Sequence, residues 1–304
     1  MHDSREAPPP HLLPDLGVMQ GVYRGRQVDF STHGVVMAII NRTPDSFHDQ
    51  GRTFTLEAAL NAGLQAVRDG AEWLDIGGVP FSPDRPPVSA AEEADRVVPL
   101  IEALHARTDA LISVDTTRVE VARAAIDAGA AIINDTSCLR DAGLADLVAS
   151  SGAGLVLTHS LARPFEKLPR PQYGNVTADV LTTLTQRHAQ ALAAGVRPEQ
   201  IIIDPGPDLN KTTRHTLRLM ADLGRFTDLG RPVLAAISNK DFIGETLDRP
   251  RGERGPGTIA VATWALAAGA RILRMHDIPA AVDAVRMFEA LMGWRDPAIE
   301  EHNL

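Results

Sequence analysis

The sequence predicts an α/β fold: a (β/α)₈ TIM barrel that forms a single domain with a short N-terminal extension. Two observations carry this prediction. Eight apolar runs of strand type alternate with helical segments rich in Ala, Leu, Glu and Arg, and nearly every run ends on a polar or charged residue. The carboxyl ends of parallel strands meet at one face of a barrel, so these residues predict one functional site. The runs are residues 35–40, 72–76, 111–114, 131–133, 154–157, 200–203, 232–237 and 270–275.

The first run defines the pattern. Val35 to Ile40 is continuously apolar, which is typical of a strand buried on both faces of a parallel sheet. Asn41 interrupts it, and the Pro and Asp that follow at 44 and 45 cannot continue a central strand. The strand therefore delivers a polar side chain to its carboxyl end. Asn41 could alternatively be a turn former that bonds its own backbone.

Composition narrows the class of protein. The 304-residue chain has a net charge of −9, which argues against nucleic-acid binding. Cys138 is the only cysteine, so neither an internal disulfide nor a multi-cysteine metal cluster can form. No apolar run reaches the roughly 18 residues of a membrane span, and no signal-peptide pattern is present. We expect a soluble cytoplasmic protein with no nucleic-acid or membrane partner.

Three regions are expected along the chain. Residues 1–33 form a proline-containing tail followed by a hairpin around Gly25 that closes the bottom of the barrel. Residues 34–292 form the barrel, and residues 293–304 form a C-terminal tail. No chemistry is expected outside the barrel.

The middle strands end on candidate binding residues with open alternatives. Asp115 follows one apolar run and Asn134 follows the next, at the same level of the barrel. Either could instead cap the helix that follows. His159 could be a general base, a metal ligand or a structural histidine. After the second run, Gly77 and Gly78 permit close backbone approach, and Ser82, Asp84 and Arg85 are the side chains that could bind a polar substrate.

Asp204 is the strongest candidate for recognising a heterocycle. It ends the run at 200–203 and is followed by Pro205 and Gly206, so its carboxylate should point into the barrel mouth, and Lys211 lies in the same loop. A carboxylate in a partly dry site can accept paired hydrogen bonds from an amino-substituted heterocycle.

The last two strands carry positive charge. Lys240 follows the seventh run, and Arg274 and His276 stand two residues apart at the end of the eighth, so they face the same side. Barrels frequently bind phosphate in these two loops. Each cation alone could be a solvated surface charge. Together with the GPGT run at 255–258, they favour a phosphate site beside a heterocycle held by Asp115, Asn134, Asp204 and Lys240.

Seven motifs together resemble the dihydropteroate synthase family. They are MAIINRTPDSF, DIGG, SVDTT, INDTS, IDPG, SNKDFIG and RMHD, in this order, and the resemblance runs from about residue 34 to 290. It implies a barrel that condenses 6-hydroxymethyl-7,8-dihydropterin pyrophosphate with p-aminobenzoate in folate biosynthesis and releases pyrophosphate.

The resemblance also implies residue roles. Asp115, Asn134, Asp204 and Lys240 would hold the pterin. Asn41, Arg274 and His276 would hold the pyrophosphate, with Asn41 acting through Mg²⁺. Lys240, Arg274 and His276 would be the catalytic residues, and the reaction would resemble an SN1-like departure of pyrophosphate before the arylamine attacks. Family members are usually homodimers through late helices, which implies a homodimer here.

Two motifs depart from the family pattern. Where the family has GGESTRPG, this chain has GGVPFSPD at 77–84, which lacks the Glu, Thr and Arg. Where the family has SRKSF, this chain has Asn239 and Asp241. Asp241 places a carboxylate where the acidic arylamine would lie, and repulsion would disfavour binding by about 1 kcal/mol or more.

GGV and SNKD resemble a divergent subgroup of actinobacterial paralogues. Three hypotheses follow: a working synthase, a family enzyme with a different nucleophile, and a pterin-binding protein without turnover.

Overall fold

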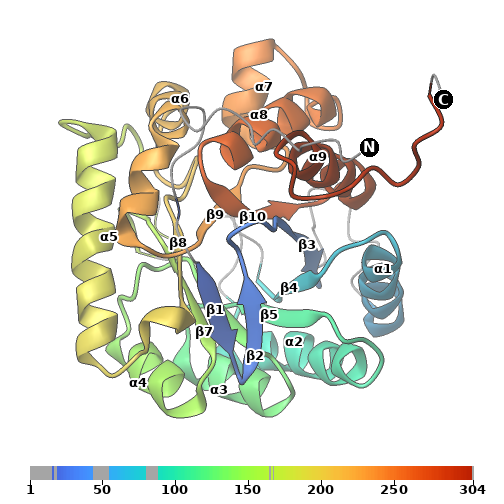
Figure 1. Ribbon diagram of the computed structural model, residues 1–304. Helices are drawn as coiled ribbons and strands as arrows, with labels where there is room; N and C mark the ends of the chain where they lie inside the picture. The colour runs from blue at the N-terminus through green and yellow to red at the C-terminus, as the bar shows by residue number, and fades with distance from the viewer. Residues whose placement is uncertain are drawn as a thin grey trace.

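Eight parallel strands close into a barrel in the order β10-β3-β4-β5-β6-β7-β8-β9, which confirms the fold class expected from the sequence. The computed structural model describes residues 16, 19–43, 55–79, 88–163, 166 and 168–302. Helices surround the barrel in Figure 1. The barrel strands are β3 Val35–Asn41, β4 Trp73–Gly77, β5 Leu111–Asp115, β6 Ile132–Asp135, β7 Gly154–Thr158, β8 Ile201–Asp204, β9 Val233–Ala236 and β10 Ala270–Met275.

The helices alternate with the strands along the chain. They are α1 Leu56–Arg68, α2 Ala90–His105, α3 Val119–Asp127, α4 Ala142–Ser151, α5 Val176–Ala193, α6 Thr213–Ala221, α7 Asp241–Leu247, α8 Gly255–Ala267 and α9 Ile278–Leu291, with 3₁₀ turns η1 Pro198–Gln200 and η2 Leu223–Leu229. Several begin at a side-chain cap: Thr55 accepts from the backbone N–H of Ala58, and Ser89 from that of Glu92. Among the described residues, no helix is long and apolar enough to cross a membrane.

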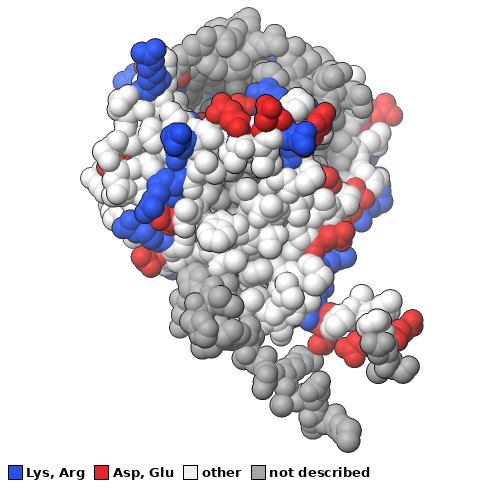
Figure 2. Space-filling model, turned by 90° about the horizontal axis from the view of Figure 1, so that it is seen from above, with Lys and Arg blue, Asp and Glu red and all other residues white. Residues whose placement is uncertain are grey.

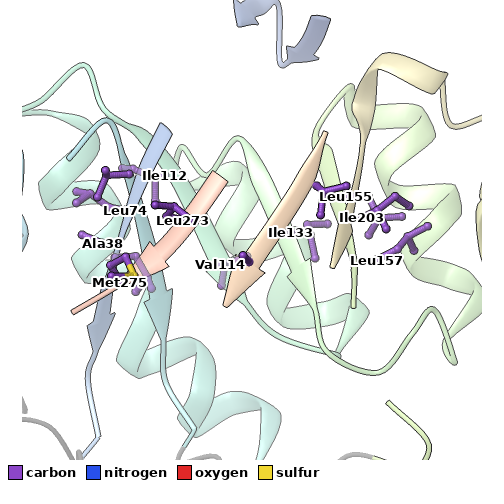
Figure 3. Packing of buried hydrophobic residues seen from close by; sticks show 14 of the residues in the cluster. Ala38, Leu74, Ile112, Val114, Ile133, Leu155, Leu157, Ile203, Leu273 and Met275 are labelled. Atoms are coloured by element: carbon purple, nitrogen blue, oxygen red, sulfur yellow. The ribbon is translucent and has the colours of Figure 1, made fainter. Parts of the chain in front are cut away.

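Strand alternation divides the apolar residues into two layers. Those that face outward, such as Ala38, Leu74, Ile112, Ile133 and Leu273, pack between the barrel and its helices (Figure 3). Those that face inward form a second cluster in the barrel, which includes Val35, Met37, Trp73, Leu111, Ile132, Val156, Ile202, Leu234 and Ile272. This second cluster closes the interior below the level at which the polar residues begin.

The N-terminal hairpin covers the amino ends of the barrel strands. Strands β1 Gln20–Tyr23 and β2 Arg26–Asp29 pair antiparallel around Gly25, whose φ of +82° is readily adopted by glycine. Tyr23 and Phe30 contact the ring of Trp73 edge-on, with centroids 5.4 and 6.0 Å apart. Figure 1 shows this hairpin across one end of the barrel.

Candidate functional site

Strand register brings the polar residues to one level. Asn41 pairs with Gly77, Gly77 with Asp115, and Asp115 with Asn134 on neighbouring strands. On the far side of the barrel, Thr158 of β7 pairs with Asp204 of β8. These residues are in phase with the inward-facing cluster, so their side chains line the interior at the carboxyl ends of the strands.

Arg274 bridges two carboxylates. Its Nε lies 2.6 Å from Oδ2 of Asp75, and one Nη lies 2.9 Å from Oδ2 of Asp115. Asn134 donates to the same Asp75 oxygen at 3.0 Å. These contacts use two of the five N–H donors of the guanidinium group. Asp75, Asp115, Asn134 and Arg274 therefore form one connected polar network.

The charged side chains of this network shift one another's pKa values. Burial, with the neighbouring Asp75 charge, raises the pKa of Asp115 to about 7, although Arg274 opposes the shift. Burial alone would lower the pKa of Arg274, but Asp75 and Asp115 outweigh it and raise that pKa. The alternative that Asp115 caps a helix is wrong, since Arg118 is the residue before α3 and Asp115 contacts Arg274.

Asp204 lies in a nearly dry pocket across the barrel. Its side chain is 3% exposed, and burial raises its pKa. Oδ1 accepts from the backbone N–H of Gly206 at 2.8 Å, and Oδ2 accepts from Thr158 at 3.4 Å. Gly206 has a φ of +66°, and a Cβ there would meet the carbonyl oxygen of His159 at 2.2 Å. The turn that aims Asp204 therefore requires glycine.

His159 forms a hydrogen bond within the site wall. Nζ of Lys211 lies 3.0 Å from Nδ1 of His159 and also donates to the carbonyl oxygens of Gly206 and Leu209, at 2.8 and 3.1 Å. Burial and the Lys211 charge lower the pKa of His159 to about 3, and burial lowers the pKa of Lys211 to about 7. Of the three alternatives for His159, these contacts favour a structural histidine.

Lys240 and His276 come from the last two strand ends. Lys240 directly precedes α7, and burial lowers its pKa while Asp208 and Asp204 oppose that shift. Nδ1 of His276 lies 2.9 Å from the Ser238 hydroxyl, which also accepts from the backbone N–H of His276 at 3.1 Å. Arg274 and His276 thus stand on the same side of β10, as their spacing predicts.

The amide of Asn41 lies against Gly77 and has an oxygen of the type that a metal ion could bind. A Cβ added to Gly77 would lie 2.7 Å from Oδ1 of Asn41, so the glycine leaves room for this amide. Among the described residues no group of three or more His, Cys, Asp or Glu side chains could hold a metal ion.

The structure adds two residues to which the sequence analysis gave no role. Asp75 is fully buried, and its Oδ1, like Oδ1 of Asn134, has no hydrogen-bond partner among the described residues. Asp75 is the middle residue of β4, so the available signal was a charged residue inside an otherwise apolar run. Asp208 contacts α6 and α7, and its only signal was a polar residue in the loop after β8.

Asp241 changes one expectation from the sequence. Its carboxylate lies 2.8 Å from Arg254 and 3.4 Å from Arg251. Partial burial alone would raise its pKa, but the hydrogen bond from Arg254 and the charge of Arg251 lower it. Two guanidinium groups therefore balance the charge that was expected to repel an acidic arylamine. Ser82, Asp84 and Arg85 lie outside the described residues.

Known proteins are similar to this chain over most of its length. The profile of the pterin binding enzyme family matches residues 37–276, from β3 to the residue after β10. The chain is 42% identical over 289 residues to the "Inactive dihydropteroate synthase 2" of Mycobacterium leprae, covering 92% of this chain and 97% of that protein. It is 37% identical over 255 residues to the dihydropteroate synthase of Haemophilus influenzae, covering 84% and 93%.

Solved structures of dihydropteroate synthases are also similar to this chain. The dihydropteroate synthase of Xanthomonas albilineans with 4-aminobenzoic acid is 39% identical, with a TM-score of 0.83 over 90% of this chain and 98% of that one. The same enzyme in complex with 7,8-dihydropteroate is 40% identical, with a TM-score of 0.80 over the same shares of each chain.

Proposed function

The chain belongs to the pterin-binding enzyme family, and from that premise we propose a dihydropteroate synthase reaction at the barrel mouth. The enzyme would condense 6-hydroxymethyl-7,8-dihydropterin pyrophosphate with p-aminobenzoate and release pyrophosphate. The proposal rests on one observation, which is that acidic and amide side chains share the barrel mouth with two cations. The acidic and amide side chains are Asp75, Asp115, Asn134 and Asp204, and the cations are Arg274 and Lys240. It combines acceptors for a heterocycle with cations for a leaving anion.

The pterin is the part of the substrate that the carboxylates suit. A pterin ring presents N–H donors on one edge, and Asp204 offers a buried carboxylate whose two oxygens each accept one bond from the protein. Oδ1 of Asp75 and Oδ1 of Asn134 are buried acceptors without partners among the described residues. Leaving such acceptors unbonded costs about 1–3 kcal/mol each, so a ligand that donates to them recovers that free energy.

The pyrophosphate would lie beside the cations. Arg274 remains charged at neutral pH, because the two carboxylates raise its pKa, and His276 directly follows the strand that carries Arg274. Asn41 would contribute one amide oxygen to Mg²⁺, which when bound would neutralise part of the pyrophosphate charge. No residue in this arrangement has to act as a nucleophile.

Catalysis would then rest on electrostatic stabilisation. As the bond to pyrophosphate breaks, Arg274 and His276 stabilise the negative charge that develops on the leaving group. Asp115 and Asp204, two acidic side chains of the barrel mouth, would stabilise the positive charge that develops on the pterin, and Lys240 would hold the ring in place. The arylamine nitrogen forms its bond to the pterin methylene and releases one proton.

A second candidate is pterin binding without condensation. Two observations favour it: the GGVPFSPD sequence at 77–84 lacks the family's Thr and Arg, and relatives at 42–43% identity are named inactive dihydropteroate synthases. The pairing of Asp241 with Arg254 removes one argument for this candidate.

We also propose a homodimer. The face at the top of Figure 1, near α7, α8 and α9, is largely uncharged where it is coloured in Figure 2. Trp264 of α8, Leu247 of α7 and Met287 of α9 are 54%, 49% and 58% exposed. Apolar side chains of this size on adjoining helices are suited to contact a second copy of the chain. Analytical ultracentrifugation of the wild type and Trp264→Lys should give a dimer and a weakened dimer. A monomeric wild type would contradict the proposal.

The proposed reaction is tested by measuring pyrophosphate release from the dihydropterin substrate with Mg²⁺, with and without p-aminobenzoate. The synthase proposal expects release that requires p-aminobenzoate and is lost in Lys240→Ala. Substrate binding without such release would favour the second candidate.

A further inference from the structure

Asp208 adopts a backbone conformation that is uncommon for residues other than glycine. Its φ is +64°, in the left-handed region that costs non-glycine residues free energy unless local contacts hold them there. Its backbone N–H donates to the Thr216 hydroxyl at 3.2 Å, and that hydroxyl donates back to Oδ1 of Asp208 at 3.0 Å. Thr216 of α6 is fully buried, so this pair of bonds fixes the loop after β8 onto α6.

The second carboxylate oxygen reaches a different helix. Oδ2 of Asp208 accepts from the backbone N–H of Phe242, in the first turn of α7, at 3.2 Å. Phe242 is 1% exposed and lies two residues after Lys240. A hydrogen bond between an N–H group in the first turn and a carboxylate is stabilising because that turn has unpaired donors. Asp208 therefore fixes the backbone from which the Lys240 side chain extends.

Asp208 also acts on Lys240 through charge. Burial lowers the pKa of Lys240, and Asp208 is the strongest of the charges that oppose this, ahead of Asp204. A loop anchor without charge could make the same backbone contacts but would not favour the charged form of the ammonium group. Contact and charge both connect Asp208 to Lys240.

We propose that Asp208 is a positioning residue, whose carboxylate holds the first turn of α7 and the Lys240 ammonium group beside Asp204 so that both can bind the pterin. This inference rests on the proposed function. Asp208 would act through Lys240 and would not itself touch the substrate.

The test uses the full chain and the variant Asp208→Asn. Asparagine tolerates the left-handed conformation and is nearly isosteric, but its amide has a single acceptor oxygen, so the change removes the charge together with one of the two hydrogen bonds that the carboxylate accepts. The matched control is Asp248→Asn, because Asp248 also has a positive φ of 52° but lies exposed at the other end of α7. The affinity for the dihydropterin pyrophosphate is measured by calorimetric titration from pH 6 to 9.

Asp208→Asn should weaken binding by about tenfold, as expected when one charge-assisted contact is lost, and Asp248→Asn should leave it unchanged. The affinity of Asp208→Asn should begin to decline at a lower pH than the affinity of the wild type. In a Lys240→Ala background, Asp208→Asn should cause no further loss, since both act through one group.

Equal affinities of the two Asn variants, or a full additional loss in the Lys240→Ala background, would overturn the inference. If the wild type does not bind the pterin, the proposed function fails. The titration of Lys240 in the free protein, followed by NMR of ¹³C-labelled lysine, still decides the matter: its pKa should fall in Asp208→Asn, and an unchanged value would refute the inference.

Discussion

Several charged side chains at this site each contact a side chain of opposite charge. Arg274 is shared by Asp75 and Asp115, and Asp241 is matched by Arg254 and Arg251. At Arg274 and Asp75, which little water reaches, an unpaired charge would be strongly destabilising, whereas the Asp241 side chain is 58% exposed and water screens its charge. The consequence of a substitution therefore depends on which partner it leaves behind.

Replacing Arg274 should destabilise the fold as well as the site. Arg274→Gln leaves the buried Asp75 and the partly buried Asp115 without their cation, and we expect the free energy of unfolding to fall by about 3 kcal/mol. Urea denaturation measures it. Arg218→Gln is the control, because that exposed arginine pairs with Asp222 at 2.8 Å on the surface of α6 and should cost less than about 1 kcal/mol. Equal costs would show that the Arg274 pairs contribute no more than a surface pair.

Asp241→Ser should strengthen arylamine binding only modestly. The substitution removes a carboxylate already matched by two arginines, and leaves Arg254 and Arg251 with surplus positive charge. We expect the KM for p-aminobenzoate to fall about two- to fivefold in steady-state assays. The double variant Asp241→Ser/Arg254→Gln should lose most of this gain. A gain of a hundredfold would restore the view that Asp241 repels the arylamine.

At the scale of elements, the loop before β3 is fastened to the last helix. Nδ1 of His33 lies 3.0 Å from Glu289 of α9, and its Nε2 lies 2.8 Å from Glu72 at the start of β4. Glu289 also accepts from the backbone N–H of Gly34 and from Arg295. These bonds join the first and last elements of the barrel at the end opposite the candidate site.

This junction should make stability depend on pH. The hydrogen bond to Glu72, opposed by partial burial, raises the pKa of His33. A histidine whose pKa is raised in the folded state stabilises the fold fully at pH values below its unfolded pKa, which is near 6.5. This stabilisation is lost as the pH rises through the folded pKa. The stability difference between wild type and His33→Gln should therefore be largest below about pH 6.5 and shrink above it, by up to about 1 kcal/mol. Urea denaturation across pH measures this, with the exposed His105 replaced as the control. A pH-independent difference would contradict the assignment.

For the whole molecule, the sequence alone was sufficient to predict the barrel architecture. Continuous apolar runs that end on Asn41, Asp115, Asn134 and Asp204 predict buried parallel strands with polar ends. The register aligns the first three of these ends, and Asp204 pairs with Thr158 at the carboxyl end of β7. The run at 232–237 was too long at both ends, because β9 ends at Ala236 before the turn that leads to Lys240. Local patterning is enough to predict such elements because each strand carries its own burial signal.

The side-chain network could not be predicted in the same way. Arg274 and Asp75 are 199 residues apart in sequence, and no local pattern encodes their contact. The pairing of Asp241 with Arg254 likewise depends on how α7 and α8 pack, and sequence analysis therefore overstated its repulsion. Residue types at strand ends predict which chemistry is present, but tertiary packing decides which charges are balanced.

The most direct test of the central claim is the affinity of the protein for 6-hydroxymethyl-7,8-dihydropterin pyrophosphate with Mg²⁺, compared between the wild type and Asp204→Asn. The account predicts saturable binding by the wild type, weakened about 10- to 100-fold in Asp204→Asn because a neutral amide replaces the carboxylate acceptor. Both proteins should show similar circular dichroism spectra. Equal affinity in the two proteins, or no binding by the wild type, would contradict the assignment of the barrel mouth as a pterin site.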